Sequence, residues 1–169
     1  MAVPGTYTVS LAKRVDGVST PLGEAQTFTA EPLGLVDVPA AKRGEILAFQ
    51  RKAARLQRAV LGANETVKEA QVRLDHLKKA LVDAPGADLK LLDEARAIQS
   101  RLADLKTVMT GDPVARKYNE PAAPSITERV NQVVEGCWEA TTGPTVTHRQ
   151  QADLAGALFQ DALGKLQAL

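Results

Sequence analysis

Few residues of this chain have the types and the spacing that chemistry requires. Its two histidines, His76 and His148, lie far apart, and neither stands in a metal-binding pattern such as His-Glu-x-x-His. The single cysteine, Cys137, has no basic neighbour in the sequence to lower its thiol pKa, so we expect a small buried hydrophobic residue and not a nucleophile. The single tryptophan, Trp138, is expected to pack in the core or between helices. These residues predict no catalytic, metal-binding or cofactor-binding site.

The acidic residues are spaced as partners on helix surfaces. Glu69 stands four residues before Arg73, in the order that favours an ion pair on a helix. Asp75 and Lys79 have the same spacing and are expected to pair in the same way. A glycosidase needs two carboxylates that converge across a cleft, and the sequence leaves such a pair open. The alanine-rich apolar positions of the helices nevertheless favour close packing with little room for a cleft.

Charge gives no indication of a polyanionic partner. The net charge is +1, from 21 basic and 20 acidic residues, so we expect neither nucleic acid nor an anionic membrane as partner. Arg51, Arg55 and Arg58 share one helix face without interleaved aromatic residues, which is typical of a solvated flank. No apolar run approaches the roughly 18 residues that cross a bilayer, so no membrane insertion is expected.

From about residue 39 the apolar residues recur every three or four positions, which is the helical period. One unbroken apolar seam passes through Gly62 and ends before Pro85-Gly86, so it predicts a single helix of about 40 residues, continuous from about residue 40 to 83. Its members are Ile46, Phe49, Ala53, Leu56, Val60, Ala63, Val67, Ala70, Leu74, Leu77 and Leu81.

Three further helices are expected after the long one. Asp88 is a plausible N-cap for the next helix, which Gly111-Asp112-Pro113 ends. Ser125-Ile126-Thr127-Glu128 has the pattern of a capping box, and Thr147-His148-Arg149-Gln150 resembles it. The residues between Pro113 and Pro124 are expected to form an ordered connector. The fold class is therefore mainly α, a bundle of about four antiparallel helices.

The first 33 residues differ from the rest in their period. Tyr7, Val9 and Leu11 alternate with polar residues, Asp16-Gly17 suits a tight hairpin turn, and Thr27-Phe28-Thr29-Ala30 is strand-like again. We therefore divide the chain into a β-hairpin, residues 1–33, and a helical bundle, residues 34–169. A two-stranded hairpin cannot hide these apolar side chains, so we expect it to dock on the bundle or to pair with a second copy.

Some segments of the chain are less generic than the rest, namely residues 4–17, 111–112, 119–121, 124–130 and 143–145. These segments resemble the C-terminal region of large bacterial BNR-repeat β-propeller proteins, which are often labelled glycosyl hydrolase or sortilin-like. In that group the last strands of a β-sandwich precede a helical tail. The resemblance implies a C-terminal accessory segment of an exported protein, periplasmic or extracellular, with residues 1–33 a remnant of the sandwich. The propeller motif Ser-x-Asp-x-Gly-x-x-Trp is absent, so the resemblance carries over no catalytic residue.

The sequence favours a non-catalytic structural or interaction module, whose partner is the rest of its own parent polypeptide. Two alternatives stay open. A homo-oligomerisation module is one, because the long apolar seam is able to pair with its own copy in a homodimer. A small hydrolase with a cleft between hairpin and bundle is the other, and it requires converging titratable residues in a pocket.

Overall fold

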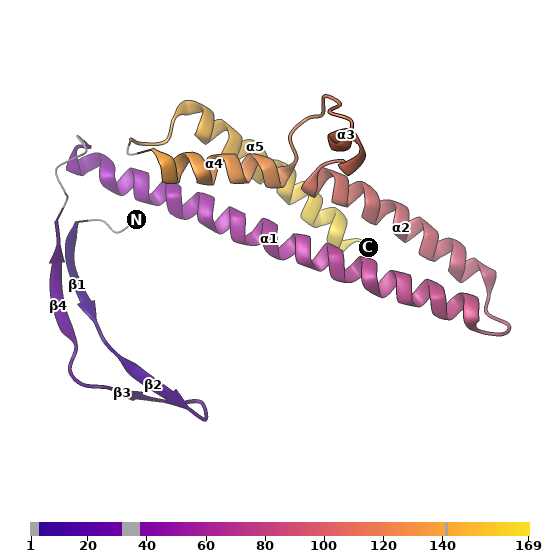
Figure 1. Ribbon diagram of the computed structural model, residues 1–169, viewed down its shortest axis with the longest axis horizontal. Helices are drawn as coiled ribbons and strands as arrows, with labels where there is room; N and C mark the ends of the chain where they lie inside the picture. The colour runs from indigo at the N-terminus through magenta and orange to yellow at the C-terminus, as the bar shows by residue number, and fades with distance from the viewer. Residues whose placement is uncertain (1–3, 32–37, 141) are drawn as a thin grey trace.

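The computed structural model describes residues 4–31, 38–140 and 142–169 of the chain. A long β-ribbon extends from one end of a helical bundle, as Figure 1 shows. In the described residues four strands are followed by five helices. The expected mainly α fold, with one very long helix and an N-terminal hairpin, is confirmed.

Helix α1, Ala40–Asp83, is one continuous helix of 44 residues, as the apolar seam predicted. Gly62 does not interrupt it, and Ala84 closes it with a backbone bond to the carbonyl of Ala80. The seam is buried through most of its length because the other helices pack along it. Its fully buried members are Phe49, Ala53, Val60, Ala63, Val67 and Leu74.

Side-chain caps fix where the shorter helices begin. Asp88 accepts a bond from the backbone of Lys90, and Ser125 with Glu128 forms the predicted capping box. The cap of the last helix was predicted two residues too late. Thr145, and not Thr147, accepts a bond from the backbone of His148 at 3.1 Å, so the helix begins directly after it. The helices are α2 (Leu89–Thr110), α3 (Pro113–Lys117), α4 (Ile126–Glu139) and α5 (Val146–Gln167).

The core divides into two clusters along α1. The larger cluster joins α1 to α2, α4 and α5, and includes Leu102, Met109, Ile126 and Phe159. The smaller cluster lies toward the start of α1, where Phe49 and Ala53 meet Val133 and Ala152. Each large apolar side chain that is fully buried stabilises the fold by roughly 1.5–3 kcal/mol, so these contacts hold the helices together.

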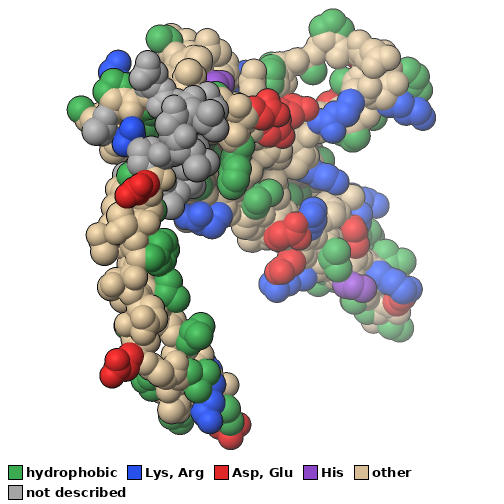
Figure 2. Space-filling model, turned by 60° about the vertical axis from the view of Figure 1, so that its left-hand side comes forward, with side chains coloured by type: hydrophobic (Ala, Val, Ile, Leu, Met, Phe, Trp, Pro, Cys, Tyr) green, Lys and Arg blue, Asp and Glu red, His purple; other side chains and the backbone are tan. Residues whose placement is uncertain are grey.

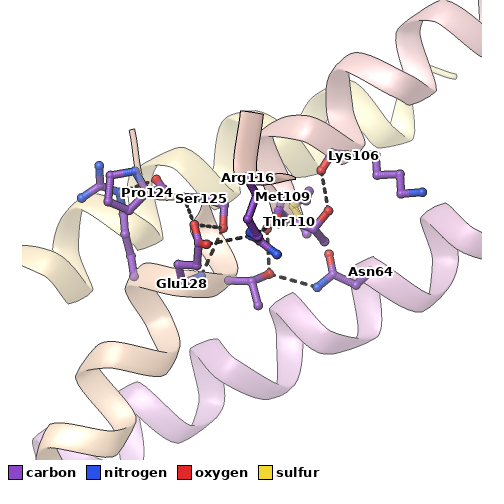
Figure 3. A network of polar contacts seen from close by, with 10 residues as sticks. Asn64, Lys106, Met109, Thr110, Arg116, Pro124, Ser125 and Glu128 are labelled. Atoms are coloured by element: carbon purple, nitrogen blue, oxygen red, sulfur yellow. Dashed lines mark hydrogen bonds and ion pairs between the residues drawn. The ribbon is translucent and has the colours of Figure 1, made fainter. Parts of the chain in front are cut away.

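A polar layer crosses the bundle where α1, α2 and α4 meet (Figure 3). The Asn64 amide donates to Thr127 Oγ1 at 3.1 Å, and the Thr127 hydroxyl donates to the carbonyl of Met109 at 2.7 Å. Arg116 joins the connector to this layer. Its guanidinium donates to Glu128 at 2.8 Å and to the carbonyl of Thr110 at 3.1 Å. The connector is therefore ordered, and it contains the short helix α3.

The N-terminal strands form a single antiparallel ribbon with a break in the middle. Strands β1 (Gly5–Val9) and β4 (Gln26–Ala30) pair near the bundle, and β2 (Ala12–Val15) and β3 (Val18–Pro21) pair at the tip. The tip turn has positive φ at both Asp16 (48°) and Gly17 (82°), which is the geometry that a tight hairpin turn needs. The predicted boundary between residues 33 and 34 lies outside the described residues.

Candidate interaction surface

The histidines lie apart, as their sequence positions indicated. His76 is exposed on α1. His148 lies half-buried in the first turn of α5, against the backbone of Gly136 in α4. Among the described residues, no three His, Cys, Asp or Glu side chains lie close enough together to hold a metal ion.

Cys137 and Trp138 differ in their surroundings although they are neighbours on α4. Cys137 is half-buried beside the smaller core cluster, and burial raises the pKa of its thiol. Trp138 was expected in the core, and that expectation is wrong, because its side chain is 80% exposed.

One of the two predicted ion pairs is present in the structure, and the other is not. Arg73 lies 3.5 Å from Glu69, as expected. Lys79 pairs with Asp83 at 2.7 Å and not with Asp75, which instead accepts a bond from Gln71. Lys79 has an acidic residue four positions away on each side, so spacing alone did not decide between them.

The predicted arginine flank is solvent-facing. Arg51, Arg55 and Arg58 are exposed, and none has an ion-pair partner among the described residues.

Two hollows of the bundle are apolar: one lies between α1, α2 and the end of α5, and the other between α1 and α4. No helix in the described part of the chain is long and apolar enough to cross a membrane.

The candidate interaction surface is one face of the β-ribbon. The strand register places Tyr7 opposite Phe28 and Val15 opposite Val18, and a backbone bond from Leu22 to Leu11 (2.8 Å) joins the two halves of the ribbon. Because side chains alternate along a strand, the apolar residues of both halves share one face, on which Lys13 opposite Thr20 and Gln26 opposite Val9 are the polar positions. We call this set the apolar ribbon face: Tyr7, Val9, Leu11, Val15, Val18, Leu22 and Phe28.

The opposite face of the ribbon is polar near the bundle. Thr6 pairs with Thr29, and Thr8 pairs with Thr27, so threonines line that face of the β1–β4 ladder. Threonine favours strands but leaves a hydroxyl for water, whereas leucine and phenylalanine have no such group. The ribbon is thus an amphipathic sheet fragment with one side suited to a buried position.

The apolar ribbon face is bare in this structure. Apart from Tyr7, which is partly buried, its members are 49–67% exposed. In Figure 2 hydrophobic side chains follow one side of the extended arm, which stands clear of the helices. No strand of the described residues packs extensively on a helix, so of the two expected outcomes docking on the bundle is not observed, and pairing with a second copy stays a prediction. The reason for the absent docking is geometric: the ribbon leaves the bundle near the start of α1 and extends away from it.

The outer edges of the ribbon are a second feature of this surface. Each strand has a single neighbouring strand in the described residues, so no further described strand pairs with β1 or with β4. Such edges accept an additional strand from another chain or domain. The surface can therefore bind a β-sheet in two ways at once, by edge pairing and by burial of its apolar side chains.

Sequence reasoning identified only part of this face. Tyr7, Val9, Leu11 and Phe28 were recognised from their alternation, whereas Val15, Val18 and Leu22 were not assigned to strands. Val18 and Leu22 follow the Asp16-Gly17 turn and are an even number of residues apart, so they fall on the same face of a strand. This spacing was the signal that could have identified them.

Comparison with known proteins identified no related protein. The chain matches no protein-family model, and neither the curated proteins nor the solved structures contain a significant match.

Proposed function

We propose that this chain is a non-catalytic interaction module that joins its helical bundle to the β-rich part of a larger, exported β-propeller protein. The observation that carries this function is the apolar ribbon face, because a soluble domain rarely leaves so many apolar side chains exposed on one side of a ribbon. A two-stranded ribbon is also marginally stable alone and gains stability when further strands join it. The expected partner is a β-sandwich that precedes the ribbon in the parent polypeptide.

The contacts of the ribbon favour a sheet as partner and not a helix. Its polar face and its apolar face alternate with the strand period, and no third strand pairs with it in the part of the chain that the structure describes. A sheet that receives β1 or β4 as its edge strand would bury Val9, Leu11 and Phe28 in its own core. Burial of each half-exposed side chain contributes about 1 kcal/mol, so the whole face supplies several kcal/mol of attachment.

The hydrolase alternative gains no support from the described hollows. Both lie within the bundle, and their linings are mainly alanine, leucine and other apolar residues. The titratable residues on the rim of the larger one, Glu69 and Arg73, are paired with each other. A cleft between ribbon and bundle would need extensive contacts between them, and none are present among the described residues.

The test begins with the reading frame upstream of Met1. The region that it encodes is expressed as a separate polypeptide, and its binding to this chain is measured by calorimetry. The double variant Leu11→Ser/Phe28→Ser should weaken binding about 30-fold or more, from the loss of about 1 kcal/mol at each position.

The matched control changes the opposite face of the ribbon. Thr8→Ser/Thr27→Ser alters the same ribbon without touching the apolar ribbon face, and should change the affinity less than about 3-fold. Absence of a β-rich upstream region, or equal binding by both double variants, would rule out the proposed attachment.

A further inference from the structure

A second apolar surface lies at the far end of the bundle from the ribbon. The α1–α2 hairpin runs past the C-terminal end of α5, as Figure 1 shows, so α5 covers only part of the groove between them. The uncovered groove has a volume of about 750 Å³. Its lining includes Ala70, Leu74 and Leu77 of α1, Ile98 and Leu102 of α2, and Leu166 of α5.

Apolar side chains continue from this groove toward the tip of the hairpin. Leu77 is 52% exposed and Leu91 is 47% exposed, although both belong to the apolar seams of their helices. In the first part of α1 the corresponding seam residues are buried by α4 and α5. The exposed seam residues therefore mark the positions that further helices would cover.

Two opposite charges flank the α2 side of this surface. Glu94 and Arg101 stand four residues before and three residues after Ile98, so all three share one side of α2. Neither charged side chain has an ion-pair or hydrogen-bond partner among the described residues. On α2 only Asp93 and Arg96 form an ion pair, and Lys90, Asp104 and Lys106 have no ion-pair partner among the described residues either.

We propose that this groove is a homodimer interface, in which the α1–α2 hairpin of a second copy covers the exposed seam. The two copies are related by a two-fold axis near Ile98, with their α2 helices antiparallel. Glu94 of each copy then faces Arg101 of the other, because an isologous interface pairs residue i with j and j with i. The spacing of the two charges, about 10 Å along the helix, gives two equivalent ion pairs.

The charge pattern favours a second copy over an unrelated partner. A partner surface with charges of one sign only would place a like charge against either Glu94 or Arg101. A second copy in antiparallel order places an opposite charge against each of them. The apolar residues supply the affinity, and the ion pairs fix the register. The interface is only a few helical turns long, so the dimer should be weak, with a dissociation constant in roughly the micromolar range. This inference is independent of the function proposed for the ribbon.

Sedimentation velocity on the full chain, from about 5 µM to 1 mM, tests the interface. Glu94→Arg and Arg101→Glu should each weaken dimerisation at least 10-fold, because each places like charges together across the axis. The double variant Glu94→Arg/Arg101→Glu should restore it, and an equimolar mixture of the two single variants should form a heterodimer. Glu135→Arg, on the exposed surface of α4, is the matched control and should leave the dimer unchanged.

Each result decides for or against the groove. A chain that stays monomeric to 1 mM would overturn the proposal, and so would a dimer that ignores the single charge reversals or is not restored by the double one. The variant Leu11→Ser/Phe28→Ser distinguishes dimerisation through the ribbon from dimerisation through the groove, because it should leave the groove dimer intact. If that variant abolishes the dimer while both single charge reversals do not, the interface is the ribbon and the groove proposal is wrong. Circular dichroism checks that each variant is folded.

Discussion

Tyr7 and Phe28 stack across the β1–β4 ladder, with ring centroids 5.7 Å apart and ring planes inclined by 19°. The pair lies on the apolar ribbon face, and Phe28 is still 53% exposed after the contact. It is the one aromatic contact that the ribbon makes within itself among the described residues. The ribbon therefore depends on local cross-strand pairs, while the bundle depends on its own core.

Replacing Phe28 by alanine should loosen the ribbon and leave the bundle unchanged. The aromatic pair contributes about 0.5–1.5 kcal/mol, which is large for a two-stranded ribbon. Amide hydrogen exchange of residues 5–9 and 26–30 should become faster, while that of α1 stays within error. Thr27→Ser is the control on the opposite face. A fall in the midpoint of thermal unfolding of the helices would contradict the separation of ribbon and bundle.

A side chain at Gly136 should be destabilising, because the imidazole of His148 in α5 lies against this position of α4. A methyl group at this position would lie 2.5 Å from Nε2 and 2.7 Å from Cε1 of His148. Gly136→Ala should lower the free energy of unfolding by about 1–3 kcal/mol in urea denaturation.

Two further variants separate this clash from a general effect of alanine. His148→Ala in the Gly136→Ala background should restore part of the loss, since it removes the clashing ring. Gly156→Ala, which meets nothing within 4 Å on α5, should be neutral or stabilise by up to about 1 kcal/mol. Equal losses from both glycine variants would show that the contact with His148 is not the cause.

Glu128 should make stability depend on pH in the acidic range. Its hydrogen bonds from the backbone and the hydroxyl of Ser125, and the nearby charge of Arg116, lower its pKa below the ordinary value of 4.5. The folded state therefore favours the carboxylate. The stabilisation is fully present above about pH 4.5 and is lost as the pH falls through the lowered pKa.

The variant Glu128→Gln tests this dependence. At pH 7 it should lower the free energy of unfolding by about 0.5–1 kcal/mol, the usual size of a capping contribution. The difference from the unmodified chain should be smaller at about pH 3 than at pH 7, because a larger fraction of Glu128 is protonated at the lower pH. Urea denaturation at the two pH values measures it, and an equal difference at both would show that ionisation of Glu128 does not contribute.

Local patterns in the sequence determined most of the helical architecture. The unbroken spacing from Ile46 to Leu81 was sufficient to predict α1, because a chain reversal would have shifted the apolar period. Asp88 and the Ser125–Glu128 box located two helix starts, since a cap needs only residues within one turn.

The errors concern choices that neighbouring elements decide. The exposure of Trp138 depends on what lies beside the end of α4, which spacing within α4 does not report. Thr145 and Thr147 are both suitable caps, and the cap that forms depends on the path of the chain after Pro144. The alternation of the ribbon residues likewise showed which side chains share a face but did not show that the face is bare, because alternation does not report what covers a face.

Amide hydrogen exchange tests the role of the ribbon most directly. The exchange of residues 5–30 is measured in this chain alone and in the complete polypeptide that its reading frame encodes. If the ribbon joins a sheet, the outward-facing amides of β1 and β4 should exchange at least 10-fold more slowly in the complete polypeptide, because a neighbouring strand then accepts their hydrogen bonds. Equal exchange rates in the two proteins would show that the ribbon remains bare and would contradict its function as an attachment.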